Sequence, residues 1–213
     1  MLKDIIIIEN IGSIDLFRRL MEFMICNIGN LFSANSISKY LKSEKKINNN
    51  KNKNKKTSPN TILDYISYAS NAFLLYQVKR EDLKGKTILK TLEKYYVVDQ
   101  GFYYLFNDEN KRDTGFLIEN IVYLELIKRR YNITIGKINN LEVDFICKRP
   151  GKTFYVQVSE SVNDPITRKR EFTSLEKIKD NHPKYLITTD QINYSQNGII
   201  HMNILEFLKK ENL

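Results

Sequence analysis

The chain of 213 residues is long enough for one large domain or two small ones, each with a hydrophobic core. Its formal net charge is +9, but residues 42–56 hold seven lysines against one glutamate, so the overall charge is weak evidence for nucleic-acid binding. No apolar run reaches the ~20 residues that cross a bilayer, and Cys26 and Cys147 have neither disulfide nor zinc spacing. These features predict a reduced, cytoplasmic protein without membrane spans.

The first part of the chain predicts three helices and two strands. Ser13, Ser33 and Ser58 each precede apolar residues that recur with the period of a helix, and Pro59 favours the start of the third helix. Residues 48–56 contain only asparagine and lysine and predict a disordered insertion. Residues 75–78 and 95–98 are typical of strands.

Three helices followed by a strand, a basic loop and a second strand are the elements of a winged helix. In that fold the third helix enters the major groove by its N-terminal residues. The residues expected to contact DNA lie at this helix start and in the basic loop: Asn60, Thr61, Lys79, Arg80, Lys84 and Lys86. The alternative is a helical bundle that binds a protein instead of a nucleic acid.

The second domain is predicted to begin near residue 111, so that the domains are 1–110 and 111–213. The predicted order is helix, three strands, helix, two strands and helix, at 113–130, 131–138, 141–148, 153–159, 168–180, 184–188, 198–201 and 203–210. This order indicates an α/β domain with a mixed central sheet.

A candidate metal site comes from acidic residues in these elements. The strands at 141–148 and 153–159 are joined by a turn at 150–152 and predict a β-hairpin. Glu142 and Asp144 are two residues apart in the first strand and are expected to share one face, with Val143 and Phe145 on the other. Together with Glu119 of the preceding helix, they predict oxygen ligands for Mg²⁺. This order of parts is that of the restriction-endonuclease-like nuclease fold, in which the carboxylates hold a divalent metal.

The next strand departs from that nuclease pattern. The fold expects an acid and, two residues later, a lysine, but this sequence has Gln157 and Ser159. The candidate catalytic residues are therefore Glu119, Asp144 and Gln157, with Glu119 and Asp144 as metal ligands. Cleavage would need a displaced cation, for which Arg170 and Lys184 are candidates.

The remaining motifs give one phosphate-binding candidate and no nucleotide site. Arg168 and Arg170 lie at a predicted helix start, where an N-terminus and a basic cluster can receive phosphate. The Gly-Lys-Thr runs at 85–87 and 151–153 lack the earlier glycine of a phosphate-binding loop, so no nucleotide is expected. His182 and His201 have no second ligand at metal spacing and are interpreted as structural.

The chain resembles the C-terminal region of prokaryotic AAA-type ATPases that end in a domain of unknown function with a restriction-endonuclease-like fold. The motifs that carry the resemblance lie in order along nearly the whole chain: Lys3-Asp4-Ile5-Ile6, Lys94-Tyr95-Tyr96, Asp99-Gln100-Gly101, the run from Glu119 to Leu126, Glu142-Val143-Asp144-Phe145, Gln157-Val158-Ser159, Arg170-Glu171 and Pro183-Lys184-Tyr185. The resemblance implies an ATPase domain upstream, normally in the same polypeptide, and makes Gln-x-Ser a feature of this branch.

We therefore expect a DNA-binding, nuclease-like C-terminal module of an AAA-type ATPase that has lost catalysis. Double-stranded DNA and the ATPase domain are the expected partners. Two alternatives remain open from the sequence. One is a Mg²⁺-dependent DNA endonuclease with a displaced cation, and the other is a protein-interaction or oligomerisation module that regulates the ATPase.

Overall fold

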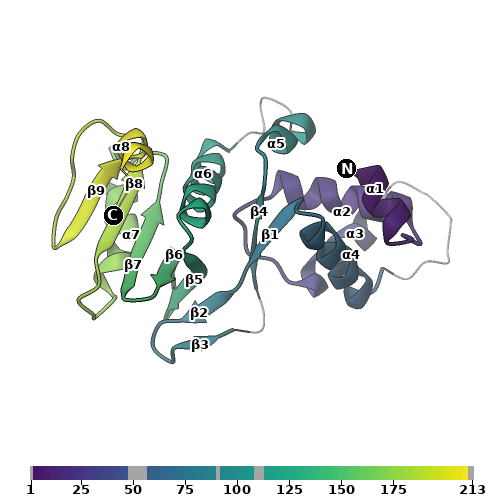
Figure 1. Cartoon of the computed structure of the whole chain (residues 1–213), viewed down its shortest axis with the longest axis horizontal. Coiled ribbons are helices and arrows are strands. Elements are labelled where there is room, and N and C mark those ends of the chain that lie inside the picture. Colours follow the sequence, from purple (N-terminus) through teal and green to yellow (C-terminus); the bar gives the residue numbers. More distant parts are fainter. Residues whose placement is uncertain (1, 48–56, 90–91, 108–112, 211–213) are drawn as a thin grey trace. The chain divides into compact units, whose positions relative to one another are not determined.

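The computed structural model describes residues 2–47, 57–89, 92–107 and 113–210, and the predicted insertion at 48–56 lies outside these ranges. The chain divides into two compact units (Figure 1). The first comprises residues 1–77 and 91–112, and the second comprises residues 78–90 and 113–213. The architecture is mixed α/β, as expected, with a mixed seven-stranded sheet among the residues described.

The first unit is organised around helix α2. Its elements are α1 (Leu2–Ile8), α2 (Ile14–Cys26), α3 (Ala34–Ile47), α4 (Pro59–Asn71), β1 (Leu75–Val78), β4 (Lys94–Val97) and α5 (Gly101–Phe106). Phe17 of α2 is fully buried and meets Tyr65 of α4 edge to face, with ring centroids 5.6 Å apart. The three predicted helices and both predicted strands are present, and β1 pairs with β4. Helices α1 and α5 lie outside the predicted elements.

The segment between β1 and β4 differs from the prediction of a wing loop. It forms a hairpin of β2 (Arg80–Asp82) and β3 (Thr87–Ile88), and β2 pairs in parallel with β5 (Asn132–Ile138). Strands β2 and β3 therefore belong to the sheet of the second unit, which includes residues 78–90, whereas the predicted boundary placed these residues with 1–110. Local sequence indicated a basic loop here, because the strand depends on pairing with a partner about 55 residues away in the chain.

The second unit places helices on a sheet of order β3-β2-β5-β6-β7-β8-β9. Its further elements are α6 (Thr114–Lys128), β6 (Leu141–Arg149), β7 (Lys152–Val158), α7 (Pro165–Glu176), β8 (Lys184–Thr188), β9 (Ile199–Asn203) and α8 (Ile204–Lys209). Strands β5, β6 and β7 are antiparallel, whereas β7, β8 and β9 are parallel. The predicted element types are all present, with α7 beginning at Pro165 instead of residue 168.

The two main helices cover opposite faces of the sheet. Phe145 packs on Tyr123 of α6, whereas its neighbour Ile146 belongs to a buried cluster with Phe172 of α7. Because successive residues of a strand point to opposite faces, α6 and α7 lie on opposite sides of β6.

A β-bulge interrupts β6 at the candidate site. Thr134 pairs with Ile146 but Gly136 pairs with Val143, so β6 has one extra residue between these pairs. Val143 consequently shares the α7-side cluster with Ile146, while Phe145 faces α6. Strict alternation predicts that Val143 and Phe145 share a face, and this prediction is wrong because the bulge shifts the register.

Gly136 offers a test of this packing. A Cβ at this position would lie 3.0 Å from Val143 Cβ and 3.2 Å from Leu83 Cδ1, so a methyl group fits only if these side chains move by a few tenths of an ångström. We expect Gly136→Ala to lower the free energy of unfolding by about 1–3 kcal/mol in urea denaturation. Gly85→Ala is the control, because its nearest neighbour would be 3.4 Å away. Equal losses for both variants would contradict the tight packing at the bulge.

Candidate functional site

Asp144 and Gln157 face each other across strands β6 and β7. The backbone N–H of Asp144 donates to Gln157 Oε1 at 3.3 Å, and the Val158 N–H donates to Asp144 Oδ2 at 2.9 Å. Asp144 is 6% exposed and Gln157 is 8% exposed. The antiparallel hairpin that was predicted at this point thus brings two of the three candidate catalytic residues together.

Helix α7 adds a second carboxylate to this pair. Gln157 Nε2 donates to Glu171 Oε2 at 2.8 Å, and Ser174 Oγ donates to Gln157 Oε1 at 3.3 Å. Arg170 Nη2 then donates to Glu171 Oε1 at 2.7 Å. We call these five residues, Asp144, Gln157, Arg170, Glu171 and Ser174, the Gln157 network.

Glu171 and Ser174 are the members of the network that the sequence analysis does not select. Both are buried although α7 is polar overall. Their spacing of three residues places both on one face of the helix, beside the apolar residues Phe172 and Leu175. Polar residues at helical spacing on a core-facing stripe were the available signal, but the sequence could not show that Gln157 lies opposite them.

The hydrogen bonds of the network determine what it can do chemically. The Gln157 carbonyl accepts two hydrogen bonds and its amide donates to Glu171, so this side chain brings no charge to the site. Arg170 is the one predicted cation that reaches the network, and its guanidinium is held by Glu171. Lys184 instead donates to the backbone carbonyls of Asp180 and His182, at 2.7 and 3.3 Å.

The predicted magnesium ligands give no complete coordination set. Glu119 is buried in α6, and Glu142 lies opposite Lys137 in the ladder of β5 and β6. In the described ranges no three His, Cys, Asp or Glu side chains gather closely enough to hold a metal ion. Oxygens of Asp144 and Glu171 are also engaged by Val158, Gln157 and Arg170, so a metal would have to displace these donors. Magnesium binding stays a prediction that this donor set does not favour.

The predicted nucleic-acid contacts of the hairpin fall into two groups. Lys79, Lys84 and Lys86 are exposed on or beside β2 and β3. Arg80, in contrast, is only 8% exposed, and its Nε has no hydrogen-bond partner in the part of the chain that the structure describes. Arg80 is therefore not displayed to a ligand as its lysine neighbours are.

Helix α4 offers a poor surface for phosphate. Asn60 is exposed, but the hydroxyl of Thr61 lies 2.9 Å from that of Ser58, which caps the helix. The helix contains no Lys or Arg, and Asp64 on its exposed side is acidic. DNA contact by Asn60 and Thr61 remains a prediction, without a basic residue of this helix to support it.

The N-terminus of α7 is capped by a carboxylate of the protein itself, that of Asp164. Asp164 Oδ2 accepts the Thr167 N–H at 2.7 Å, and this hydrogen bond lowers the pKa of the Asp164 carboxyl. The carboxylate occupies the position at which a phosphate would meet the helix N-terminus. Arg168 and Arg170 follow in the first two turns, so any phosphate contact here falls to side chains.

A second buried network lies beyond the ends of β7 and β8. The Asp190 carboxylate accepts the Val162 N–H and the Ser161 hydroxyl, each at 2.7 Å, and the Thr188 hydroxyl at 3.2 Å. His201 Nε2 lies 2.8 Å from Thr188 Oγ1, and the Tyr194 N–H donates to His201 Nδ1 at 3.1 Å. His201 is thus a hydrogen-bonded neutral ring within the fold.

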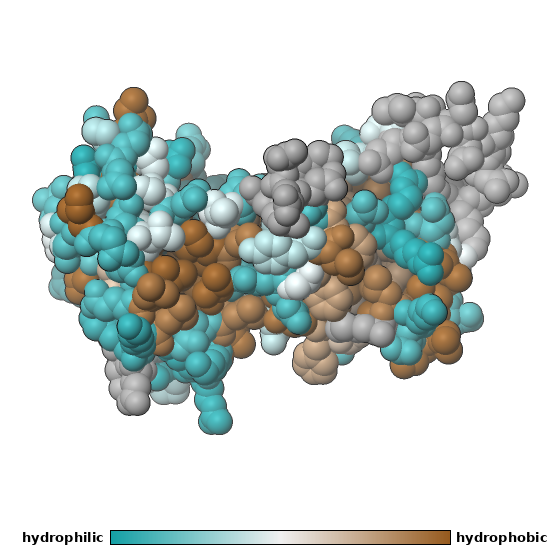
Figure 2. All heavy atoms as spheres, turned by 90° about the horizontal axis from the view of Figure 1, so that it is seen from above, coloured by the Kyte–Doolittle hydropathy of each residue, from teal (hydrophilic) through white to brown (hydrophobic). Residues whose placement is uncertain are grey.

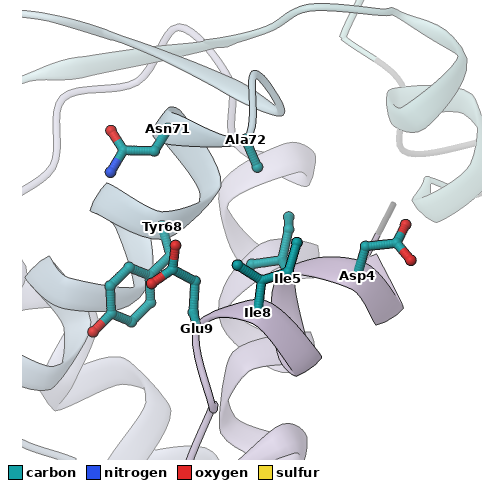
Figure 3. Close-up of a pocket in the computed structure, with 7 residues that line it drawn as sticks. All are labelled: Asp4, Ile5, Ile8, Glu9, Tyr68, Asn71 and Ala72. Carbon is teal, nitrogen blue, oxygen red and sulfur yellow. The ribbon is translucent and has the colours of Figure 1, made fainter.

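The first unit contains a pocket between α1 and α4. Its volume is about 290 Å³, and Figure 3 shows Ile5 and Ile8 of α1 facing Ala72, with Tyr68 and Asn71 on the α4 side. Glu9 lies beside Tyr68, and Asp4 is also part of the lining. The pocket is therefore mainly apolar with acidic residues at its rim.

Two families account for nearly the whole chain. Residues 1–112 match the family described as "Domain of unknown function (DUF8612)", which covers more than half of the sequence. The chain belongs to this family. Residues 114–207 match a second family model, "Domain of unknown function (DUF4143)".

Two uncharacterized proteins are similar to the chain. One, from Haemophilus influenzae, is 33% identical over 187 residues, which are 88% of this chain and 44% of that protein. The other, from Methanocaldococcus jannaschii, is 32% identical over 183 residues, which are 84% of this chain and 38% of that protein. The chain thus spans less than half the length of either relative. No solved structure matches it.

No helix in the described ranges is long and apolar enough to cross a membrane.

Replacing Gln157 tests the network. We expect Gln157→Leu to lower the free energy of unfolding by about 1–3 kcal/mol, because the Asp144 N–H and the buried Glu171 carboxylate would each lose a hydrogen-bond partner. Urea denaturation measures the change, and Gln191→Leu is the control because Gln191 is exposed. A Gln157→Leu variant as stable as the control would show that the network contributes little to stability.

The environment of His201 leads us to expect that stability depends on pH. Burial lowers its pKa below the ordinary 6.5, and the nearby Asp190 carboxylate offsets this only in part. The unfolded chain therefore takes up the proton at a higher pH than the folded chain does. Stability is complete above about pH 6.5 and falls as the pH drops through that value. We expect His201→Gln to remove this component between about pH 7 and 5, as followed by denaturation at each pH.

The exposed His182 supplies the control for this experiment. His182→Gln should leave the pH dependence in place. Asp190 does not interfere with this test. Burial raises the pKa of its carboxyl, but hydrogen bonds from Val162, Ser161 and Thr188 together outweigh burial, so the pKa lies below 3.8. The contribution of Asp190 to stability is therefore lost only in more acidic solution. An unchanged slope in His201→Gln would contradict the assignment.

Proposed function

We propose that the second unit is a nuclease-like module that binds nucleic acid without cleaving it. Its elements α6, β5, β6, β7, α7 and β8 follow the order of the restriction-endonuclease-like fold, with three antiparallel strands and a fourth strand parallel to the third. Under this proposal, Asp144 and Gln157 take the positions of that fold's acidic residues. The resemblance of the sequence to this fold supports the same assignment.

The main observation behind the proposal is that the polar groups of the Gln157 network hydrogen-bond to one another. A cleavage site needs an acid and a cation that are free to meet metal, water and phosphate. Here Gln157 is neutral and bonded to Glu171, and Arg170 is bonded to the same carboxylate. Ser159 donates to the Ser161 carbonyl at 3.2 Å and supplies no charge. The network therefore serves better as a scaffold than as a catalyst.

Charge supports a nucleic-acid partner for this unit. Residues 78–90 and 113–213 contain 20 Lys and Arg against 15 Asp and Glu, so the unit is basic without the lysine-rich tract at 42–56. Lys79, Lys84 and Lys86 belong to this unit and are exposed. Cations of this kind bind phosphates in a manner that does not depend on base sequence. We further propose that an AAA-type ATPase segment works with the module, as the resemblance implies.

A second candidate function concerns the first unit, which could be a protein-interaction module. Large apolar side chains are exposed there, among them Ile7, Ile8, Phe73 and Leu105, at 71–77%. On the face drawn in Figure 2, hydrophobic residues gather in patches among hydrophilic ones. The apolar pocket beside α1 gives this candidate a specific place (Figure 3). Under this function, self-association in light scattering would accompany a lack of nucleic-acid binding.

Binding and cleavage are tested together with a 20-base-pair duplex, a single strand and supercoiled plasmid. We expect binding without cleavage in Mg²⁺ or Mn²⁺, and a steep loss of affinity with salt. Lys79→Gln combined with Lys84→Gln should reduce the slope of log affinity against log salt by about 2 for the duplex. Lys177→Gln combined with Lys179→Gln is the control, because these exposed lysines lie at the far end of α7.

Three results would change the assignment. Cleavage that Asp144→Ala abolishes would establish the metal-dependent nuclease instead. An absence of binding even at low salt would leave the protein-interaction function. Binding that disappears when residues 48–56 are deleted would place the attraction in the lysine-rich tract and not in the second unit.

A further inference from the structure

The loop between β8 and β9, residues 189–198, is firmly attached to the loop before α7. Asp190 anchors it through the three hydrogen bonds described above and a fourth from Asn163 Nδ2, at 2.9 Å. The Thr189 N–H and hydroxyl also donate to the Glu160 carbonyl, at 3.0 and 2.7 Å. From the other side, Asn203 Nδ2 donates to the Asp190 carbonyl at 3.0 Å. Asp190 is only 7% exposed, so these bonds form a buried clamp.

This clamp fixes the position of Tyr194. The Tyr194 N–H donates to His201, and its hydroxyl donates to Asn163 Oδ1 at 2.7 Å. Asn163 therefore joins Tyr194 to Asp190 through the two ends of one amide group. With backbone and hydroxyl both held, the ring has little freedom to turn.

Arg168 lies over this ring. Its guanidinium carbon is 4.4 Å from the centre of the Tyr194 ring, a distance at which a cation is attracted to an aromatic face. Within the described residues, the Arg168 guanidinium has no hydrogen bond and no ion pair, whereas that of Arg170 is bonded to Glu171. Stacking occupies the face of the guanidinium and leaves its N–H edge free for an acceptor.

The backbone at the start of α7 cannot take the place of this side chain. Asp164 already accepts the Thr167 N–H, and its negative charge would repel a phosphate. A phosphate that approaches α7 therefore needs a cationic side chain that also offsets the charge of Asp164, and the positive charge of Arg168 already helps to lower the pKa of that carboxyl. The stack on Tyr194 holds Arg168 in one orientation, which reduces the entropy lost when it binds.

We propose that Arg168, held by Tyr194, is the main phosphodiester contact of α7, and that the 189–198 loop is its positioning element. This inference rests on the proposed nucleic-acid binding of the second unit. It assigns different roles to the two arginines at the start of α7. Arg168 binds the ligand, whereas Arg170 pairs with the buried Glu171.

A double-mutant cycle on the full chain tests the inference, with anisotropy of the labelled duplex and single strand as the measurement. Arg168→Gln should weaken binding and lower the salt slope for the duplex by about 1. Tyr194→Leu should weaken binding about three- to tenfold while Arg168 is present. In an Arg168→Gln background, Tyr194→Leu should have no further effect, because the side chain it positions is gone.

Matched variants separate positioning from general damage. Tyr194→Phe keeps the ring and should retain most of the affinity, and Lys177→Gln removes a distant charge of α7. Arg168→Lys keeps the charge without the planar stack, so it should fall between wild type and Arg168→Gln. If Tyr194→Leu does not fold, Arg168→Lys tests the contribution of the stack in its place.

The outcomes distinguish the two levels of proposal. If the wild-type chain binds neither probe at low salt, the proposed function fails. If the wild-type chain binds but Arg168→Gln matches Lys177→Gln, Arg168 is not the main contact. Equal losses from Tyr194→Leu with and without Arg168 would overturn the positioning role, as would an Arg168→Lys variant that binds as well as wild type.

Discussion

The burial of Glu171 is the constraint on which the second unit depends. A carboxylate that is taken out of water is stable only if donors replace the solvent. Gln157 provides one donor from the sheet, and Arg170 provides others from the helix itself. Apolar packing has no direction of its own, whereas the Gln157–Glu171 hydrogen bond pairs one position of α7 with one position of β7.

The same principle operates at the carboxyl ends of the parallel strands. Asp190 is a second buried carboxylate, and its donors come from the loop that leads into α7. Glu171 therefore holds the middle of α7 against the sheet, and Asp190 holds the loop that leads into the N-terminus of α7. Between them, Arg168 remains without an acceptor in the described protein. The two buried acids are thus satisfied by donors of the protein, whereas Arg168 keeps its N–H groups available for a ligand.

Sequence patterns were sufficient for most elements. Helix α2 buries one stripe with helical period, and the short apolar runs of β6, β7 and β8 indicated strands, which the structure buries on both faces. Sequence patterns failed where structure depends on partners that are distant in the chain. The hairpin at 78–90 has the local sequence of a basic loop, and only its pairing with β5 reveals a strand. The bulge in β6 arises from the register against β5, which alternation cannot show. Asp144 and Gln157 were found as a pair because a short turn joins their strands, whereas Glu171 needed the packing of α7.

The parallel pairing of β2 with β5 also limits how the two family-matched regions can be separated. A piece that starts at residue 113 follows the boundary between the matches but removes β2 from the sheet. The N–H and C=O groups of β5 on that side would then lose their partners and form an open edge, a template for strand addition from another molecule. The segment matched by the second family and the segment that forms the complete sheet therefore differ by the hairpin of β2 and β3. Expression of a piece that starts at residue 113 is expected to give domain-swapped or aggregated protein.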